Sequence, residues 1–348
     1  MVEHEHRPRV SVITPVRDGA ADIAALLACL ERQTYPREDF EIVIGDDGST
    51  DGGTIGIETE DGHVRVASGP PRNSYATRNM AVAASRGEVI AFCDADCRPE
   101  PDWIERGLAA LETTDIVAGR FRYDVPQART AWTLIDMDGS KDHEHSVRVG
   151  LAETANLFIR RDLFDRLGGL DGSIAEYGDY EFAERAVAAG ARLTFGRDAV
   201  VWHPTRDAGR PLLRALWKYN KGYAVHAARA GVLPDGVKLR EWVPVVQTFR
   251  SRRRFGRSIG PDRPWMRANG IELSTWELLK ALPILYLVVP YLRNAASCRA
   301  GARAGACVAP APRSPLRGPS ARRRRRRSSR WSGGADPRYP WPDNHPER

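Results

Sequence analysis

Aspartate side chains follow three short apolar runs of this 348-residue chain: Asp18, the pair Asp46 and Asp47, and the pair Asp94 and Asp96. If the runs are parallel strands, their carboxyl ends meet at one edge of a sheet, where ligands bind in open α/β folds. Carboxylates gathered at one edge repel one another unless a cation lies between them. Carboxylate oxygens are the ligands that Mg²⁺ and Mn²⁺ prefer. The spacing therefore predicts a divalent cation at this edge.

The neighbouring residues indicate what else would bind there. In the Asp-x-Asp pair at 94 and 96, one carboxylate can hold a cation and the other a ribose or phosphate oxygen, although the pair alone also fits a solvated turn. Gly48 permits a tight turn after Asp47, whose carboxylate can accept hydrogen bonds from a nucleobase edge or ribose hydroxyls. Arg78, on a predicted helix, would bring a guanidinium to a diphosphate. Together these residues predict a nucleoside diphosphate site.

The elements that must position these residues alternate along the chain. β-Branched runs predict strands at 10–16, 41–46, 88–96, 115–121 and 192–195, and apolar periodicity predicts helices at 23–30, 74–86, after Pro101, at 161–167 and at 179–189. Such alternation favours an α/β fold in which a mostly parallel sheet lies between two layers of helices. The segment 122–152 loses this periodicity, which predicts a long connection near a site.

Charge divides the chain into parts. The net charge is −14 for residues 1–209, +11 for 210–267, zero for 268–297 and +10 for 298–348. We therefore predict a catalytic domain at 1–209, a basic helical extension at 210–297 and a disordered Arg-rich tail at 298–348. The acidic half is not expected to read a specific nucleic acid. The run of six arginines at 322–327 could bind any polyanion, because charge alone does not distinguish them.

A membrane contact is predicted for the extension. Residues 281–292 are uncharged, but Pro283 and Pro290 interrupt them, and they fall short of the ~20 residues that span a bilayer. Beside them, residues 214–231 predict a basic helical hairpin bearing aromatic side chains. The combination fits a peripheral site on an anionic membrane surface. A helical cap whose Arg and Lys face water is the alternative.

The cysteine spacing and the first residues of the sequence indicate the cellular compartment. Five cysteines form no CxxC pair, and the first residues, MVEHEHRPRV, carry no basic stretch followed by an apolar one. We expect a reducing environment and a cytoplasmic location. Peripheral attachment to the inner face of the cell membrane is compatible with this location.

Four sequences, taken in order, resemble the GT-A fold family 2 glycosyltransferases: VSVITPVRDG, IVIGDDGSTDGG, TRNMAVAASRGEVIAFCDADC and YGDYEFAERAVAAGARL. The resemblance covers about residues 8–205. It implies a GT-A-type fold and transfer of a sugar, with inversion, from a uridine, guanosine or thymidine diphosphate donor. The acceptor would be a hydroxyl of a glycan or lipid-linked molecule, as in cell-surface polysaccharide or glycolipid synthesis, and the cofactor would be Mg²⁺ or Mn²⁺.

The resemblance also implies residue roles. For the donor, Asp47 would contact the base with support from Asp46, Arg78 would contact the base or diphosphate, and Asp94 would contact the ribose. The pocket would be lined by Pro15, Asp18 and Asn156, and the metal would be held by Asp96 and His203. Asp179 would accept the proton of the acceptor hydroxyl. Many members have Glu-Asp where this chain has Gly178-Asp179. Glu176 and Glu181 therefore remain reserve candidates for the base.

The absence of several sequence motifs from this chain disfavours other classes of protein. The chain has no GxGxxG after its first strand and no GxxxxGK[ST], which disfavours a dinucleotide dehydrogenase and a P-loop NTPase. No QxxRW follows Asp179, which disfavours a processive polymer synthase. Two alternatives stay open. One is a sugar-phosphate nucleotidyltransferase, for which TPVRDGAAD supplies little glycine; the other is a non-catalytic polyanion-binding protein with a degenerate transferase domain.

Overall fold

The computed structural model describes residues 8–125, 130–137, 143–229, 276 and 279. The predicted tail, the apolar segment 281–292 and the rest of the extension beyond residue 229, apart from residues 276 and 279, lie outside the described residues.

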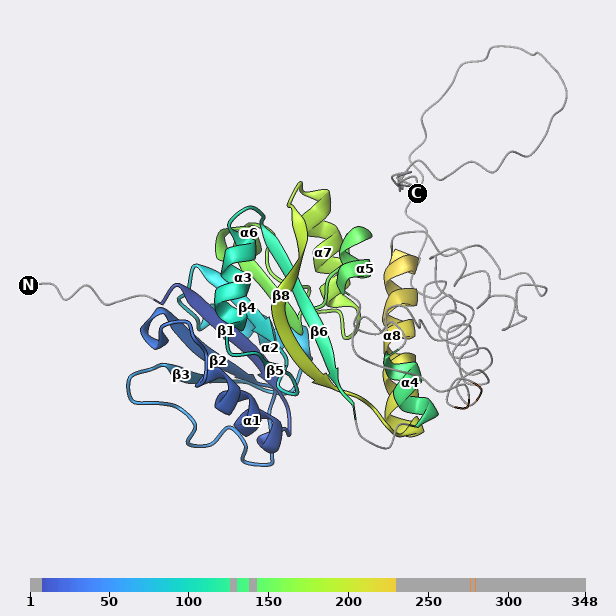
Figure 1. Cartoon of the computed structure of the whole chain (residues 1–348), viewed down its shortest axis with the longest axis horizontal. Coiled ribbons are helices and arrows are strands. Elements are labelled where there is room, and N and C mark those ends of the chain that lie inside the picture. The colour runs from blue at the N-terminus through green and yellow to red at the C-terminus, as the bar shows by residue number, and fades with distance from the viewer. Residues whose placement is uncertain (1–7, 126–129, 138–142, 230–275, 277–278, 280–348) are drawn as a thin grey trace, which may run out of the picture. The chain divides into compact units, whose positions relative to one another are not determined.

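The described residues form an eight-stranded sheet with the order β3-β2-β1-β4-β7-β6-β8-β5 (Figure 1). Its strands are β1 Val10–Val16, β2 Phe40–Asp46, β3 Val64–Ser68, β4 Val89–Cys93, β5 Arg98–Pro99, β6 Ile116–Asp124, β7 Asn156–Arg160 and β8 Leu193–Pro204. β3, β2, β1 and β4 are mutually parallel, β6 pairs in parallel with β8, and β7 and β5 are antiparallel to their neighbours. The carboxyl ends of β1, β2 and β4 therefore meet at one edge.

Helices cover both faces of the sheet. They are α1 Ala20–Leu30, α2 Ser74–Ala83, α3 Trp103–Leu111, α4 Ala131–Met137, α5 His143–Arg148, α6 Arg161–Arg166, α7 Gly178–Ala188 and α8 Gly209–Arg229, with a 3-10 turn η1 at Arg37–Asp39. Successive side chains of a strand point to opposite faces. Accordingly, Val12 packs in one apolar core with α1 and α3, and Ile13 packs in a second with α2, α6 and α7. The predicted α/β class is confirmed.

Three expectations about elements were wrong. β8 continues to Pro204, so His203 lies within the last strand and not after it. The charged pair Arg197 and Asp198 interrupts the apolar pattern of β8, so the sequence pattern predicted a strand that ended at residue 195. The segment 122–152, which we expected to be a long connection outside the core, contains the end of β6 and the helices α4 and α5, and Leu134 and Ile135 of α4 are buried.

The predicted hairpin at 214–231 is also absent: the described part of this segment is one continuous helix, α8. It packs against α4 and against the backbone of Glu176, where Gly222 leaves room for close approach. The glycine within this segment lies inside the helix, where a Cβ would come within 2.7 Å of Glu176.

Two further findings concern the described residues. Cys29, Cys93 and Cys97 are buried and form no disulfide. Within the part of the chain that the structure describes, no helix combines the length and the apolar character that crossing a membrane requires.

Candidate active site

The turns after β1 and β2 are joined by hydrogen bonds from both sides. Asp18, which has a left-handed φ of 52°, accepts bonds from the Thr50 amide (2.7 Å) and hydroxyl (3.1 Å). Its own amide donates to the Ser49 hydroxyl (3.0 Å). The bonds from Thr50 lower the pKa of Asp18, so its carboxylate stays ionised.

Asp46 and Asp47 have different surroundings. Both oxygens of Asp46 accept bonds from its own turn, Oδ1 from the Ser49 amide and Oδ2 from the Thr54 hydroxyl, each at 2.7 Å. Burial raises the pKa of Asp46, but these bonds outweigh it and hold the pKa below its usual value. Asp47 instead accepts bonds on Oδ1, from the Arg72 amide (2.7 Å) and the Thr77 hydroxyl (2.9 Å). Asp46 thus shapes the turn that presents Asp47.

Arg78 connects α2 to the turn after β4. Its guanidinium is buried and forms an ion pair with Asp94 through Nη2, while Nη1 donates to the Ser74 carbonyl (3.3 Å). Nε is buried without a hydrogen-bond partner. A buried donor left without a partner costs free energy. Arg78 therefore has bonding capacity that an anionic ligand at this edge could use.

Asp96 and His203 face one another across the end of the sheet. Nδ1 of His203 lies 2.7 Å from the Pro204 carbonyl, which can only accept, so Nδ1 carries a proton, and in the neutral ring Nε2 is the nitrogen that can bind a metal. Nε2 lies 3.7 Å from Oδ2 of Asp96, beyond hydrogen-bond distance. A carboxylate oxygen and an imidazole lone pair directed at the same space are a suitable partial ligand set for a divalent cation.

Asp179 lies in the first turn of α7. Its Oδ1 accepts bonds from the Tyr75 hydroxyl (3.1 Å) and from the Tyr180 amide (3.0 Å). The two reserve candidates have cationic partners, since Glu181 pairs with Arg185 and Glu176 with Lys218. Asp179 is therefore the acid of this segment that is linked to α2.

The N-terminal half of α2 brings the separate acids together. Asn73 caps the helix by accepting bonds from the amides of residues 75 and 76. Tyr75 then bonds Asp179, Thr77 bonds Asp47 and Arg78 pairs with Asp94. From the sequence, Arg78 was the one residue of this helix that we expected in the site. The spacing of residues 75 and 78, three apart on one helix face, was the available signal for Tyr75.

Asn156 and Pro15 differ in their placement. Asn156 is fully buried, accepts from the Trp103 indole (2.9 Å) and donates to the carbonyls of Arg120 and Ala199 (3.0 Å each). These bonds tie β7 to α3, β6 and β8, so we assign Asn156 to the core and leave it out of the site. Pro15 lies half-buried near the end of β1, where its register partner is Gly45 of β2.

Comparison with known proteins agrees with this arrangement. Residues 11–168 match the family described as glycosyl transferase family 2. The chain is 34% identical over 223 residues to "Glycosyltransferase AglE" of Haloferax volcanii, an alignment that covers 62% of this chain and 73% of that protein. The chain belongs to glycosyl transferase family 2. It is therefore a glycosyltransferase.

More distant relatives and solved structures that resemble this glycosyltransferase show its fold. It is 26% identical to the "Pre-mycofactocin glycosyltransferase" of Mycobacterium tuberculosis, over 67% of its length and 52% of that protein. Among solved structures, it superposes with a TM-score of 0.51 and 20% identity on the mannosyltransferase PcManGT of Pyrobaculum calidifontis, determined with GDP-Man and Mn²⁺. That match covers 88% of this chain and 77% of the other. The predicted GT-A-type fold is confirmed.

The residues of this family 2 enzyme fit a divalent cation only in part. Among the described residues, no group of three or more His, Cys, Asp or Glu side chains could hold a metal. Asp96 and His203 would supply two ligands. Mg²⁺ in enzymes is commonly held by one or two carboxylates together with substrate phosphates. The pair thus fits an ion that arrives with, or is completed by, a diphosphate.

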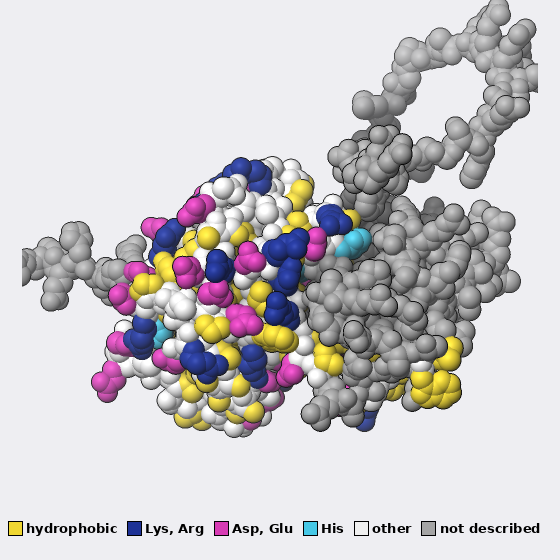
Figure 2. Space-filling model, in the orientation of Figure 1, with side chains coloured by type: hydrophobic (Ala, Val, Ile, Leu, Met, Phe, Trp, Pro, Cys, Tyr) yellow, Lys and Arg dark blue, Asp and Glu magenta, His cyan; other side chains and the backbone are white. Residues whose placement is uncertain are grey.

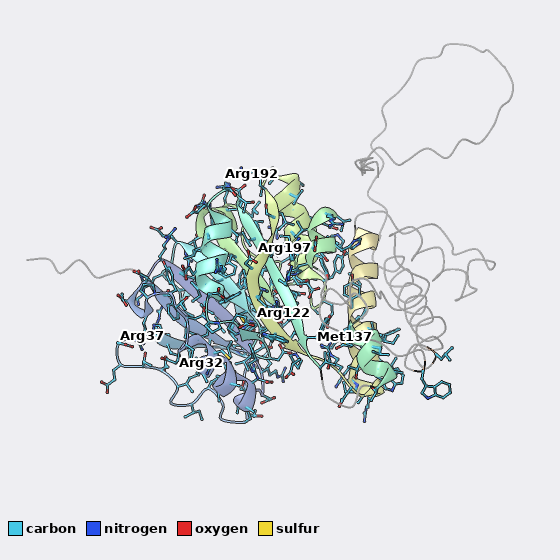
Figure 3. All side chains as sticks on the ribbon, in the orientation of Figure 1. Arg32, Arg37, Arg122, Met137, Arg192 and Arg197 are labelled. Atoms are coloured by element: carbon cyan, nitrogen blue, oxygen red, sulfur yellow. The ribbon has the colours of Figure 1, made fainter. Side chains whose placement is uncertain are left out.

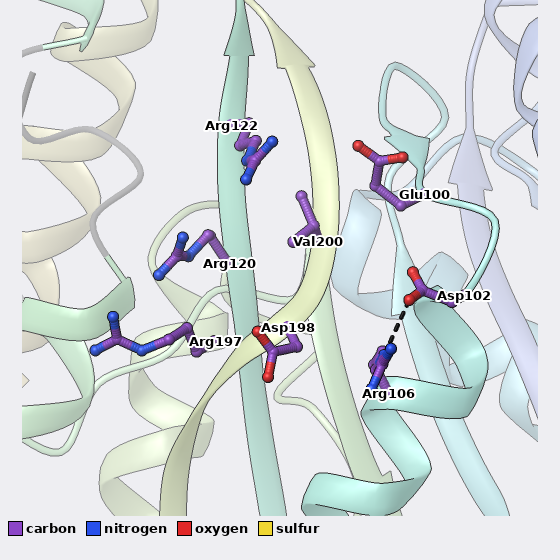
Figure 4. Close-up of a pocket in the computed structure, with 8 residues that line it drawn as sticks. All are labelled: Glu100, Asp102, Arg106, Arg120, Arg122, Arg197, Asp198 and Val200. Carbon is purple, nitrogen blue, oxygen red and sulfur yellow. Dashed lines mark hydrogen bonds and ion pairs between the residues drawn. The ribbon is translucent and has the colours of Figure 1, made fainter. Parts of the chain in front are cut away.

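A second polar area lies on β6 and β8. A depression of about 440 Å³ is lined by Glu100, Asp102, Arg106, Arg120, Arg122, Arg197, Asp198 and Val200 (Figure 4). Arginine side chains gather here on the visible face (Figure 2), with Arg122 and Arg197 over the two strands (Figure 3). Because Arg122 pairs with Trp202 and the next pair is Tyr123 with His203, His203 faces the other side of this ribbon. The depression is therefore separate from the predicted donor site.

Proposed function

We propose that this glycosyltransferase uses a nucleoside diphosphate sugar and a divalent cation, and transfers the sugar with inversion to a hydroxyl of a glycan or lipid-linked acceptor. The observation that carries the proposal is the set of contacts made by α2. One helical turn contacts Asp47, Asp94 and Asp179, acids that lie far apart in the sequence.

The donor would lie along the carboxyl edge of β1, β2 and β4. Asp47, held by Thr77 and presented by the turn that Asp46 shapes, would accept from the base, and Asp94 from the ribose. Arg78 would bring its guanidinium to the base or diphosphate. The solved relatives of this fold that were determined with GDP-Man or UDP-GlcNAc support a donor of the guanosine or uridine type. A thymidine diphosphate donor fits the same groups.

Pro15 and Asp18 would form the floor of this pocket at the end of β1. The left-handed backbone of Asp18 and its bonds to Thr50 fix the loop against the turn after β2. A loop fixed in this way needs little reordering when a ligand binds, which reduces the entropic cost of binding.

Asp96 and His203 would hold Mg²⁺ or Mn²⁺ beside the diphosphate. When bound, the cation would stabilise the negative charge that develops on the departing nucleoside diphosphate. Nδ1 of His203 donates to the Pro204 carbonyl, and this bond fixes the ring with its other nitrogen toward Asp96.

Asp179 would act on the acceptor side. An inverting transfer needs a base that accepts the proton of the attacking hydroxyl while the diphosphate leaves from the opposite side of the sugar carbon. Asp179 is half-buried, and its bonds from Tyr75 and the Tyr180 amide favour the carboxylate over the acid. An ionised, oriented carboxylate is the form that the proton transfer requires.

Donor binding tests the proposal. The purified full chain would be heated with UDP, GDP and dTDP and their sugars, each with and without Mn²⁺ or Mg²⁺. We expect one nucleotide series to raise the melting temperature, and to do so more strongly with metal, because a ligand that binds the folded state stabilises it. The same sugar nucleotide should be slowly hydrolysed.

Two results would count against the proposal. If no nucleotide sugar changes the melting temperature or is hydrolysed, the site does not bind a donor. If pyrophosphate is released from a nucleoside triphosphate and a sugar phosphate, the chain is a nucleotidyltransferase.

A further inference from the structure

Tyr75 contacts the acid that we propose as the base. It is the second residue of α2, and its side chain is buried, with 7% of its surface exposed. Its hydroxyl donates to Oδ1 of Asp179 at 3.1 Å, across 104 positions of the sequence. Burial, and then the negative charge of Asp179, raise the pKa of Tyr75 far above its usual 10.0. The phenol is therefore a hydrogen-bond donor throughout the working pH range.

The backbone that enters α7 is shaped around the Tyr75 ring. A Cβ at Gly178 would lie 2.8 Å from the ring, closer than real side chains approach. The preceding residue, Tyr177, has a left-handed φ of 75°. This close packing gives a physical reason for Gly178 where the family resemblance led us to expect a glutamate. The ring and the glycine together bring the first turn of α7 onto α2.

Tyr75 also adjoins the donor side. The guanidinium carbon of Arg78 lies 5.8 Å from the centroid of the Tyr75 ring, and Arg78 pairs with Asp94. One face of α2 therefore contacts the acid proposed for the acceptor side and also carries the arginine assigned to the diphosphate. Movement of α2 would displace both groups together.

We propose that Tyr75 is a positioning residue for Asp179: its hydroxyl orients the carboxylate and stabilises its ionised form, and Gly178 provides the space for this contact. The inference rests on the proposed function. Because a hydrogen bond donated to a carboxylate favours ionisation, loss of the hydroxyl should raise the pKa of Asp179.

Other groups near Asp179 have separate partners. The titratable and charged side chains on the elements packed here include Tyr75 and Arg78 on α2, Glu176 and Tyr177 before α7, Tyr180, Glu181, Glu184 and Arg185 on α7, and Lys218, Tyr219 and His226 on α8. Glu176, Glu181 and Glu184 pair with Lys218, Arg185 and His226 respectively. The Tyr180 hydroxyl donates to Glu153 at 2.9 Å. Tyr180 thus provides a matched comparison, as a buried tyrosine next to Asp179 whose hydroxyl is directed elsewhere.

The test compares Tyr75→Phe with Tyr180→Phe in the full chain. The pKa of Asp179 would be measured by ¹³C NMR with labelled aspartate, and its signal assigned with Asp179→Asn. We expect Tyr75→Phe to raise this pKa by about 0.5 to 1 unit and Tyr180→Phe to leave it unchanged. In the transfer reaction, Tyr75→Phe should lower kcat by about 10- to 100-fold and move the acidic limb of its pH profile to higher pH. KM for the donor should stay within about twofold of wild type.

An unchanged Asp179 pKa in Tyr75→Phe, or an equal shift in Tyr180→Phe, would overturn the inference. So would an unchanged kcat with an unchanged pH profile. The NMR comparison needs no turnover, so its failure is separate from an absence of sugar transfer in the wild-type chain, which would count against the proposed function.

Discussion

Single carboxylates in this site differ in the contacts that hold them, and those contacts separate their roles. Asp46 has both oxygens bonded by its own turn, so it supports the loop. The side chain of Asp96 is 38% exposed and faces His203 beyond hydrogen-bond distance, which suits a ligand position. Asp179 is oriented by two donors from different helices. These contacts are the basis on which we propose structural, metal-binding and catalytic roles for the three carboxylates.

This division predicts different losses for two matched substitutions. Asp96→Asn should abolish the metal-dependent part of the melting-temperature increase given by the nucleoside diphosphate, because a neutral amide is a poor ligand for Mn²⁺. Asp179→Asn should keep that increase and lower transfer by at least about 100-fold, since a general base typically contributes that much. Thermal shift and initial-rate assays on the same preparations check both. Equal loss of nucleotide binding in the two variants would refute the division.

At the scale of elements, two buried polar side chains join strands that the site depends on. Asn156 links β7 to α3, β6 and β8, and Glu41 links β2 to its neighbours. Glu41 accepts from the Ser11 hydroxyl at 2.7 Å and pairs with Arg65 and Arg86. Such groups stabilise the sheet because removing them would leave buried partners, such as the Trp103 indole and the Ser11 hydroxyl, without a hydrogen bond.

Asn156→Ala tests the structural role of this residue. The substitution leaves the Trp103 indole and the carbonyls of residues 120 and 199 without their partner, and should lower the free energy of unfolding by about 3 kcal/mol. Chemical denaturation of the variant measures this. Wild-type stability with a raised donor KM would instead place Asn156 in the donor pocket.

Glu41 predicts a pH dependence of stability. Burial raises its pKa, but bonds from the Arg86 amide, Ser11 and Arg65 outweigh burial and hold the pKa below the usual 4.5. A depressed folded-state pKa contributes stability above the unfolded-state value, and this stability is lost as the pH falls through the folded-state pKa.

Glu41→Gln should therefore lower the free energy of unfolding by about 2 to 3 kcal/mol at pH 7. The difference from wild type should shrink below about pH 4.5, as the wild-type carboxylate takes up its proton. Denaturation curves at pH 7, 5 and 4 give the comparison. A difference that stays constant with pH would contradict the assignment of this stability to the Glu41 charge.

At the scale of the whole molecule, charge separates the catalytic part from the rest. The acidic portion, 1–209, contains the carboxylates that we propose for cation binding, while 210–267 and 298–348 carry +11 and +10. The described start of the basic part is α8, which packs beside the segment that holds Asp179. We propose that the basic part lies on an anionic membrane surface, where a lipid-linked acceptor would be within reach of Asp179.

Vesicle binding checks this proposal. The full chain should sediment with vesicles that contain anionic phospholipid but not with neutral ones, and about 1 M salt should release it because screening shortens the range of charge attraction. Replacing the arginines at 322–327 by glutamine, at constant length, should weaken binding at least about tenfold. Equal binding to neutral vesicles, or unchanged binding in the glutamine variant, would argue against an electrostatic contact.

The sequence by itself determined the α/β class, the first two strands and the acids at their ends, because apolar period and turn residues are local properties. It also identified the family. It did not show that His203 belongs to a strand, that Asn156 is a core residue, or that Tyr75 contacts Asp179. These facts depend on segments 36 or more positions apart meeting in space, and a side chain acquires its partners only when the sheet order and helix packing are set. Tertiary structure therefore decided which acids α2 contacts and which hydroxyl donates to Asp179.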